Sequence, residues 1–249
     1  MNLIVEGRRI IMAFYDDKVI PILKKTSMEM EKTPHMQDIL NGTVPPERFK
    51  FQILQNHQYL LDYVRCWAVG LSKCSCFEEM NEFYKVVKRT FEKTVMMNRE
   101  FWSKDIGVTL EEMDAVIQAE GKRSYTAFQL MCAEQGGLAE ILMASHPCNA
   151  LYMYFSEDLL PRCTLPEDHS GRIWLEYYVT DGYKEIVDTE ARMIRKVCDN
   201  KSEREQAKLL EILATSCNYE IMQFNDLYYE MKTWPLNEIF PKKFTTIKE

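Results

Sequence analysis

Residues 46–73 read PERFKFQILQNHQYLLDYVRCWAVGLSK and predict one long helix with a buried face. Within this stretch Asn56, Tyr59, Tyr63 and Trp67 recur every three to four residues, so their side chains share one face of a helix. That face is aromatic except for Asn56, whose amide needs a buried partner or a cavity if the face points inward. A neighbouring helix or solvent would satisfy the amide as well, and the stretch alone leaves both interpretations open.

The rest of the chain carries the same helical period and few breaks. Gly42 is expected to end one helix and Pro147 to begin another. Pro21 is expected to kink the first helix of the chain, and Thr109 with Glu112 is typical of a capping box. Besides residues 46–73, helices are expected over residues 8–27, 34–41, 77–103, 109–119, 122–145, 147–160, 170–199 and 202–232. No connection exceeds about a dozen residues, so residues 1–249 are predicted to form one all-α domain, a helix bundle with room for an internal cavity.

Composition and charge exclude several functions. Nine glycines and nine prolines are too few for an all-β protein with many turns. The formal net charge of −7 argues against a nucleic acid or an anionic membrane as partner, because both bind a basic surface. No apolar stretch approaches the roughly 20 residues that span a bilayer, and the first residues lack the order of a secretory signal. With eight cysteines, this pattern predicts free thiols in a reducing compartment, and hence a cytoplasmic location.

One cysteine stands out by its position. Pro147 suits the first position of a helix, where its missing N–H is not needed, and Cys148 then lies in the first helical turn. Unpaired N–H groups and the positive end of the helix dipole favour the thiolate at such a position. Cys148 is therefore predicted to be a reactive nucleophile, with Tyr152 one turn away. A buried structural cysteine is the alternative, and it is the commoner role of this residue type.

Glu220 is the second candidate, because it interrupts an apolar helical stripe. Leu213, Cys217, Phe224 and Leu227 share its face, and burying the carboxyl group there without a cation would raise its pKa toward the range of a general acid or base. Pairing with a cation, or a place at the wet edge of the stripe, would remove that role.

Trp174 and Tyr178 form a third candidate, one helical turn apart. Aromatic side chains at this spacing are usually core residues. In a cavity they would instead give a heteroaromatic ligand both a stacking surface and a hydroxyl partner.

Taken in order, these segments resemble the TenA family, the thiaminase II enzymes, in its cysteine-containing class. The resemblance is carried by residues 33–51, 54–60, 124–128 and 139–142, by Pro147, Cys148 and Tyr152, by residues 174–178, and by Tyr219, Glu220 and Phe224. It is strongest over residues 10–230. TenA proteins have a heme-oxygenase-like all-α bundle and usually assemble as tetramers, which implies a homotetramer or dimer and no cofactor for this chain.

The resemblance also implies an activity. TenA enzymes hydrolyse thiamin, or aminomethylpyrimidine products of thiamin decay, and release hydroxymethylpyrimidine for salvage. By position, Cys148 is implied to be the nucleophile that adds to the pyrimidine ring, and Glu220 to carry protons to the leaving group and from water. The residues implied to bind the substrate are Asn56, Tyr59, Tyr125, Tyr152 and Tyr178.

Three positions depart from the family pattern. Aspartate is usual where this chain has Asn56, and an amide can hydrogen-bond but cannot take up charge or relay a proton. Ala150 stands where an aromatic residue is usual, and Gln223-Phe224-Asn225 replaces a Phe-Trp-Asp sequence. These departures leave open a non-catalytic pyrimidine-binding or regulatory protein, or a member with a changed pyrimidine substrate.

Haem or quinone chemistry on the same bundle would rest on fold analogy alone. Haem needs an axial ligand, and neither His35 nor His57 has supporting residues in the sequence. Cys74 and Cys76 are the only close cysteine pair and the histidines are scattered, so no metal site is expected.

Overall fold

The computed structural model describes residues 13–236 and residue 239, and its regular elements in that part of the chain are all helical. The α-helices are α1 (Ile20–Glu31), α2 (Pro34–Asn41), α3 (Pro46–Lys73), α4 (Phe77–Arg89), α5 (Ser103–Asp105), α6 (Leu110–Asp114), α7 (Glu120–Gln135), α8 (Leu138–Leu159), α9 (Ser170–Tyr177), α10 (Asp181–Cys198) and α11 (Glu203–Met222). Four π-helical segments, η1 (Tyr15–Val19), η2 (Thr90–Val95), η3 (Asn98–Trp102) and η5 (Gln223–Leu227), and one 3₁₀ segment, η4 (Leu160–Arg162), extend or link them. The all-α prediction is confirmed.

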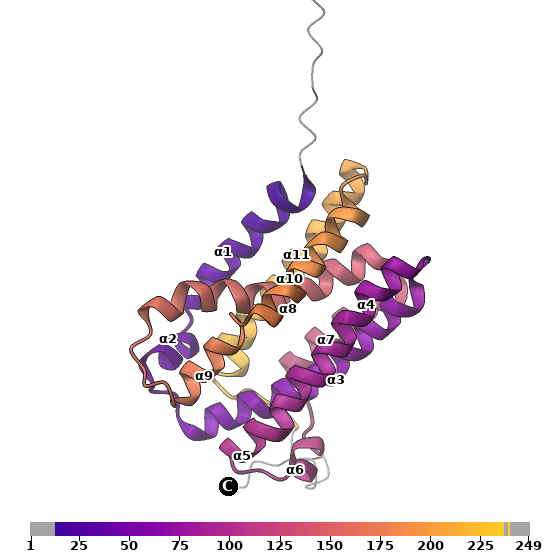
Figure 1. The fold of residues 1–249 in the computed structure, drawn as a ribbon. Helices are drawn as coiled ribbons and strands as arrows, with labels where there is room; N and C mark the ends of the chain where they lie inside the picture. Colours follow the sequence, from indigo (N-terminus) through magenta and orange to yellow (C-terminus); the bar gives the residue numbers. More distant parts are fainter. Residues whose placement is uncertain (1–12, 237–238, 240–249) are drawn as a thin grey trace, which may run out of the picture.

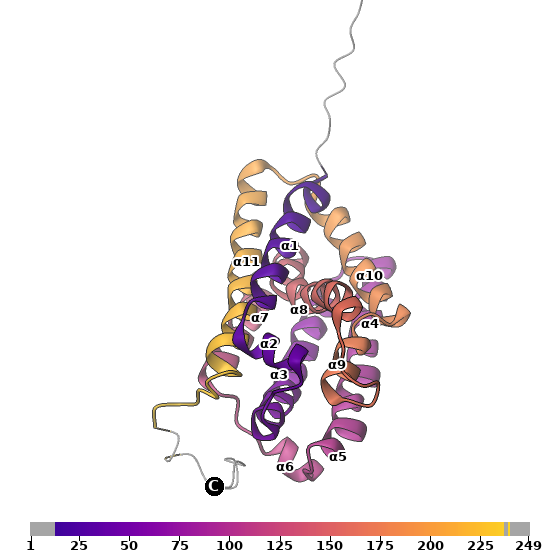
Figure 2. The same cartoon turned by 90° about the vertical axis from the view of Figure 1, so that its left-hand side faces the viewer.

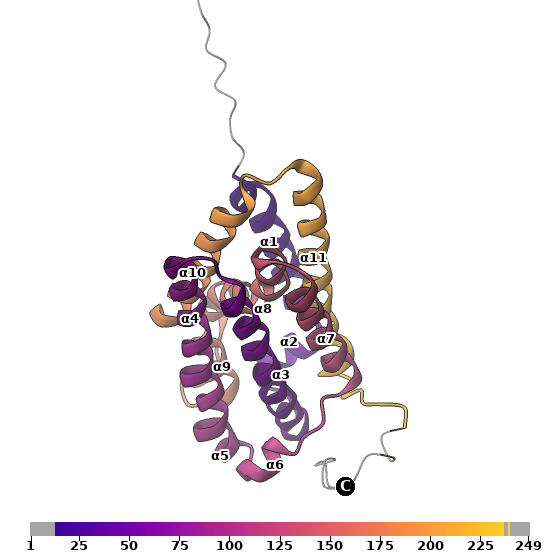
Figure 3. The ribbon, with the colours of Figure 1, turned by 90° about the vertical axis from the view of Figure 1, so that its right-hand side faces the viewer.

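Helix α8 is the centre of the bundle. It runs across the directions of α1, α3 and α11 in Figure 1 and is seen nearly end-on in the middle of the molecule in Figures 2 and 3. Around it, α1, α11, α7, α3, α4 and α10 contact one another in that order, and η1 closes the ring between α10 and α1. Every residue over 141–153 is buried, so the middle of α8 has no solvent-facing side and is mostly apolar on all its faces.

The prediction that a helix begins at Pro147 is wrong, because Pro147 lies inside α8. A proline normally breaks a helix, since it lacks the N–H and crowds the carbonyl groups of the preceding turn. Here side chains of neighbouring helices bond to two carbonyls of the preceding turn and hold α8 at the proline. The Ala144 carbonyl accepts hydrogen bonds from Ser216 Oγ (2.8 Å) and Gln129 Nε2 (3.1 Å), and the Ser145 carbonyl accepts one from the Tyr63 hydroxyl (3.2 Å).

Several expected boundaries are confirmed and others move. Helices α2 and α3 match the expected ranges, and Gly42 ends α2 in the left-handed region at φ +64°. The capping box of Thr109 and Glu112 is present, but its helix stops at Asp114. Three further ranges differ from the expected ones. The range 77–103 is a helical run from α4 to α5 that is interrupted by η2 and η3, and the range 122–145 ends at Gln135 before two glycines. The range 170–199 is divided by a turn over residues 178–180.

The first expected helix, over residues 8–27, lies partly outside the described residues. Its described part begins with η1, and Pro21 lies in the first turn of α1 directly after the π-helical segment. Farther along, α3 approaches α4 so closely at Gly70 that a Cβ atom there would overlap the ring of Phe83. In the part of the chain that the structure describes, no helix is both long and apolar enough to cross a membrane.

Candidate active site

The two predicted catalytic side chains meet in the interior, although they come from distant parts of the sequence. Cys148 lies in the middle of α8 with 8% of its surface exposed, and Glu220 lies near the end of α11 with 1% exposed. The charge of Glu220 raises the pKa of the Cys148 thiol, and both groups raise the pKa of Tyr59. The long contact between α8 and α11 brings them together.

The thiol of Cys148 does not have the environment predicted from the sequence. Burial and the nearby carboxyl of Glu220 raise its pKa well above the ordinary value, while a hydrogen bond from Tyr59 and the charge of Lys122 act in the opposite direction. Because Cys148 is in mid-helix, no helix N-terminus favours its thiolate. The prediction of a thiol activated by the helix dipole is therefore wrong, and activation has to come from other side chains or from a ligand.

The predicted environment of Glu220 agrees with the structure. Burial raises its pKa to about 7, although the charge of Lys122 and contacts from Tyr125 and Tyr152 oppose the shift. Oε2 accepts a hydrogen bond from Gln223 Nε2 at 3.3 Å, whereas Oε1 makes no hydrogen bond of good geometry to a described residue. A buried carboxyl oxygen left without a partner is suited to a ligand or to water.

Aromatic rings surround these two groups. Tyr152, one turn after Cys148, packs against Tyr178 (4.9 Å between ring centroids), Trp174 (5.8 Å) and Phe224 (6.1 Å). On the other side Tyr59 stacks on Tyr125 at 5.5 Å, and Tyr125 stacks on Tyr219 at 5.2 Å. The hydroxyl of Tyr125 is buried and also lacks a well-aligned partner among the described residues. The predicted tyrosines thus form two aromatic walls beside the thiol and the carboxyl.

Asn56 is the predicted residue that the structure ties least firmly to this cluster. It lies on α3 one turn before Tyr59 and is half-buried. Its neighbour Gln55 instead holds the segment between α6 and α7, donating to the Ile117 carbonyl (3.1 Å) and accepting from the Ala119 N–H (2.8 Å). Among the described residues, no side-chain hydrogen bond involves Asn56, so its amide is available to a ligand.

Sequence reasoning missed a buried lysine in the same cluster. Lys122 is 1% exposed, donates a hydrogen bond to Gln223 Oε1, and lies 4.4 Å from the centroid of the Tyr59 ring and 5.3 Å from that of Tyr228. Burial lowers its pKa to about 8. The available signal was its spacing, since Lys122 lies three residues before Tyr125 and so shares the buried face of α7.

A second buried polar network lies behind Cys148 and was also missed. Glu190 on α10 accepts hydrogen bonds from Asn149 Nδ2 (2.6 Å) and lies 2.7 Å from His146 Nδ1, and both side chains flank Cys148 on α8. Tyr63 and Tyr183 complete the hydrogen bonds of Asn149, at 2.9 and 3.0 Å. This network connects α3, α8 and α10 and fixes the turn of α8 that carries the thiol.

The histidines considered for haem have other partners. His35 Nε2 lies 2.8 Å from Gln52 Oε1, and His57 Nε2 lies 3.2 Å from Asp114 Oδ1. Across residues 13–236 and 239, no group of three or more His, Cys, Asp or Glu side chains is placed to hold a metal ion.

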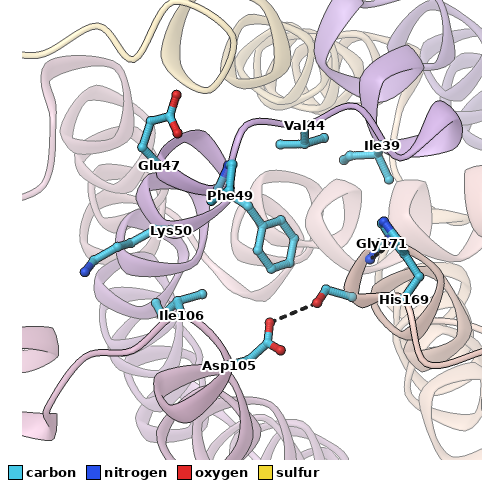
Figure 4. Close-up of a pocket in the computed structure, with 11 residues that line it drawn as sticks. Ile39, Val44, Glu47, Phe49, Lys50, Asp105, Ile106, His169 and Gly171 are labelled. Carbon is cyan, nitrogen blue, oxygen red and sulfur yellow. Dashed lines mark hydrogen bonds between the residues drawn. The ribbon is translucent and has the colours of Figure 1, made fainter.

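A separate pocket of about 560 Å³ opens near the start of α3 (Figure 4). The ring of Phe49 points into it, and the far rim is formed by Asp105, which accepts a hydrogen bond from Ser170 at 3.0 Å, and by His169 and Gly171. None of the predicted site residues lines this pocket. The candidate active site is therefore the buried cluster around Cys148 and Glu220.

Comparison with known proteins links this cluster to a family. The profile of the TENA/THI-4/PQQC family matches residues 26–231, a range that includes every residue of the cluster. The chain is 29% identical over 208 residues to the aminopyrimidine aminohydrolase of Halalkalibacterium halodurans, covering 82% of this chain and 90% of that protein. It is 28% identical over 201 residues to the aminopyrimidine aminohydrolase of Bacillus subtilis, covering 81% and 84%.

Solved structures have the same fold. The TenA homologue protein of P. horikoshii OT3 superposes with a TM-score of 0.74 at 24% sequence identity, covering 86% of this chain and 98% of that one. A TenA family transcription regulator from Silicibacter sp. TM1040 gives a TM-score of 0.75 at 18% identity, covering 86% and 96%. The ring of helices around a buried central helix is therefore a shared architecture.

Proposed function

The chain belongs to the TENA/THI-4/PQQC family, and we propose that it is a hydrolase of thiamin salvage that converts aminomethylpyrimidine to hydroxymethylpyrimidine, with thiamin as a second substrate. The names of its aminopyrimidine aminohydrolase relatives support the reaction class. The observation that carries the proposal is the burial of Cys148 and Glu220 near one another among the predicted tyrosines. A flat, electron-poor ring fits among such side chains because stacking and the tyrosine hydroxyls both favour it.

The proposed reaction uses Cys148 as nucleophile and Glu220 as proton carrier. The thiol gives its proton to Glu220, and its sulfur adds to the pyrimidine ring. Electron density then moves toward the exocyclic methylene group, the C–N bond breaks, and Glu220 protonates the departing amine. Water adds to the methylene carbon and gives a proton to Glu220, the C–S bond breaks to restore the ring, and the departing sulfur takes that proton back from Glu220. One water is consumed, and ammonia and the alcohol are formed.

Substitution of the two reacting groups tests this proposal. Cys148→Ala and Glu220→Gln are each expected to lower the release of hydroxymethylpyrimidine from aminomethylpyrimidine by at least about 100-fold, measured by chromatography. Cys132→Ala is the matched control, because Cys132 is similarly buried (6% exposed) but lies outside the cluster. Turnover by Cys148→Ala equal to that of the control would rule out the cysteine mechanism.

Asn56 favours a second function, that of a pyrimidine-binding or regulatory protein without hydrolysis. Its amide can hold a ring amino group but cannot carry a proton. Stabilisation of the protein by aminomethylpyrimidine in a thermal-shift assay, without product, would support this second function.

Asn56→Asp then separates the two functions. If the amide limits catalysis, this variant is expected to gain at least about tenfold in turnover, whereas the surface change Asn200→Asp is expected to have no effect. A gain would assign the chain to the hydrolases with a weakened proton relay. No gain, with binding retained, would favour the binding protein.

We also propose that the chain forms a homo-oligomer, a tetramer or a dimer. Phe77, Met80, Tyr84 and Phe91 are exposed along one side of α4 and η2. They follow helical spacing and make an apolar stripe that a second copy would cover. Light scattering after gel filtration would measure the state, and a monomer at high concentration would contradict the proposal.

A further inference from the structure

Lys122 is a buried cation that has no role in the proposed reaction as written. The side chain is almost completely buried, and none of the ion pairs in the described part of the chain includes it. Its hydrogen-bond partner is the neutral amide of Gln223, and its other near neighbours are the faces of Tyr59 and Tyr228. A buried cation without an adjacent carboxylate reduces stability, so its presence calls for a function.

One intermediary residue connects Lys122 to each reacting group. Toward the carboxyl, Gln223 accepts a hydrogen bond from Lys122 and donates one to Glu220 Oε2 at 3.3 Å. Toward the thiol, the Lys122 ammonium lies 4.4 Å from the centroid of the Tyr59 ring, and the Tyr59 side chain lowers the pKa of the Cys148 thiol. Gln129 Nε2 donates to the Tyr59 hydroxyl at 3.0 Å and orients it.

The charge balance of the reaction gives Lys122 its role. When the Cys148 proton moves to Glu220, one negative charge passes from the carboxylate to the sulfur, and the total charge of the pair stays at −1. A single buried cation that faces both groups compensates this charge before and after the transfer. The Coulomb energy between such charges is large in a water-excluded interior. No helix N-terminus is available at Cys148 to do the same.

We infer that Lys122 is a positioning residue that lets Cys148 ionise, acting through Tyr59 on the thiol and through Gln223 on Glu220. The inference rests on the proposed function, in that Cys148 is taken as the nucleophile. The titratable groups that act on Lys122 or contact it are Tyr59 on α3, Cys148 on α8, Glu220 on α11 and Tyr228 after η5, and Tyr125 on α7 and Tyr152 on α8 contact Glu220.

The test follows thiol ionisation directly in protein without substrate. The rate of alkylation of Cys148 by iodoacetamide is measured between pH 7 and 11, with peptide mass spectrometry to separate Cys148 from the other cysteines. Lys122→Met keeps the bulk of the side chain and removes its charge. At pH 8 it is expected to slow alkylation of Cys148 at least tenfold and to move the midpoint of the pH profile upward. An unchanged midpoint would overturn the inference.

Two further variants make the result interpretable. Lys73→Met is the matched control, because Lys73 also contacts α7, through the carbonyls of Ala133 and Gly136, but lies away from the cluster. It is expected to leave the alkylation profile of Cys148 unchanged. Lys122→Gln is the alternative if Lys122→Met fails to melt cooperatively, and the same shift is expected.

The two proposals fail in different ways. A shifted profile in Lys122→Met together with normal turnover in Cys148→Ala would contradict the proposed function and leave the electrostatic role of Lys122 intact. An unshifted profile in Lys122→Met together with loss of turnover in Cys148→Ala would contradict the role of Lys122 and leave the proposed function intact.

Discussion

The carboxyl group of Glu220 shows how strongly one residue can depend on its neighbours. In water its pKa would be near 4.5, and in the bundle burial raises it to about 7. Lys122, in the same cluster, has a pKa lowered to about 8 for the same reason. Both pKa values thus lie near neutral pH, the range in which general acids and bases operate.

These two pKa values predict a narrow, bell-shaped pH profile. Proton transfer from Cys148 requires Glu220 to be ionised, so kcat/KM is expected to fall as the pH decreases below about 7. It requires Lys122 to be charged, so activity is expected to fall again as the pH rises above about 8. Because the groups interact, the two limbs report the pair rather than either residue alone. A flat profile between pH 5.5 and 9.5 in steady-state kinetics would contradict this assignment.

The burial and ionisation state of single side chains could be predicted from the sequence to different degrees. The burial of Glu220 follows from the apolar stripe around it, which is a local pattern. The spacing of Lys122 to Tyr125 was only a weak signal, and Glu190 has none, because charged residues on helices are usually solvated and only the packing of other helices buries them. The state of Cys148 was mispredicted because it depends on whether α8 begins or continues at Pro147.

At the scale of single elements, local signals predicted helix ends well where the chain itself supplies the stop. Helix α2 ends at Gly42 because a left-handed residue cannot continue a helix, and α3 starts at Pro46 as proline's fixed φ allows. The same rule, that proline marks the start of a helix, gave a wrong prediction for α8. The carbonyls of Ala144 and Ser145, in the turn before Pro147, are bonded by Tyr63, Gln129 and Ser216 from three other helices, which no local pattern contains.

The close contact between α3 and α4 gives a prediction for one element pair. Gly70→Ala would place a Cβ atom inside the ring of Phe83, so α4 has to shift, and unfolding free energy is expected to fall by about 1–3 kcal/mol. The matched control is Gly182→Ala in the first turn of α10, where a Cβ atom meets nothing within 4 Å. It is expected to change stability by less than about 1 kcal/mol. Urea unfolding followed by circular dichroism compares the two, and equal midpoints would contradict the overlap.

At the scale of the whole molecule, the class of fold was predictable and its arrangement was not. Helical periodicity along the chain and scarce glycine and proline indicate an all-α bundle without reference to any contact. The position of α8 inside a ring of six helices depends on which apolar helix faces pack against each other. Local sequence patterns do not specify that pairing. The meeting of Cys148 and Glu220 was expected only from the family resemblance.

The buried charge of Lys122 predicts a pH-dependent stability for the whole fold. Its pKa is lower in the folded state than in the unfolded chain, so the folded state is disfavoured while the lysine is charged, below about pH 8, and recovers as the pH rises toward 10.5. Lys122→Met is therefore expected to raise stability by roughly 1–3 kcal/mol at pH 6, where Glu220 is largely neutral, and less at higher pH. Differential scanning calorimetry measures the effect. A lower Tm than wild type at pH 6 would contradict this account.

The proline in α8 has a consequence for the order in which the chain assembles. The carbonyl groups of Ala144 and Ser145, in the turn before this proline, acquire their side-chain partners only when α3, α7 and α11 have all docked, since each helix supplies one of the side chains. Before that moment the middle of α8 lacks part of the bonding that an uninterrupted helix would have on its own. It follows that these hydrogen bonds form in the same step that closes the surrounding helices, and that the local geometry of the Cys148 segment is a property of the finished bundle.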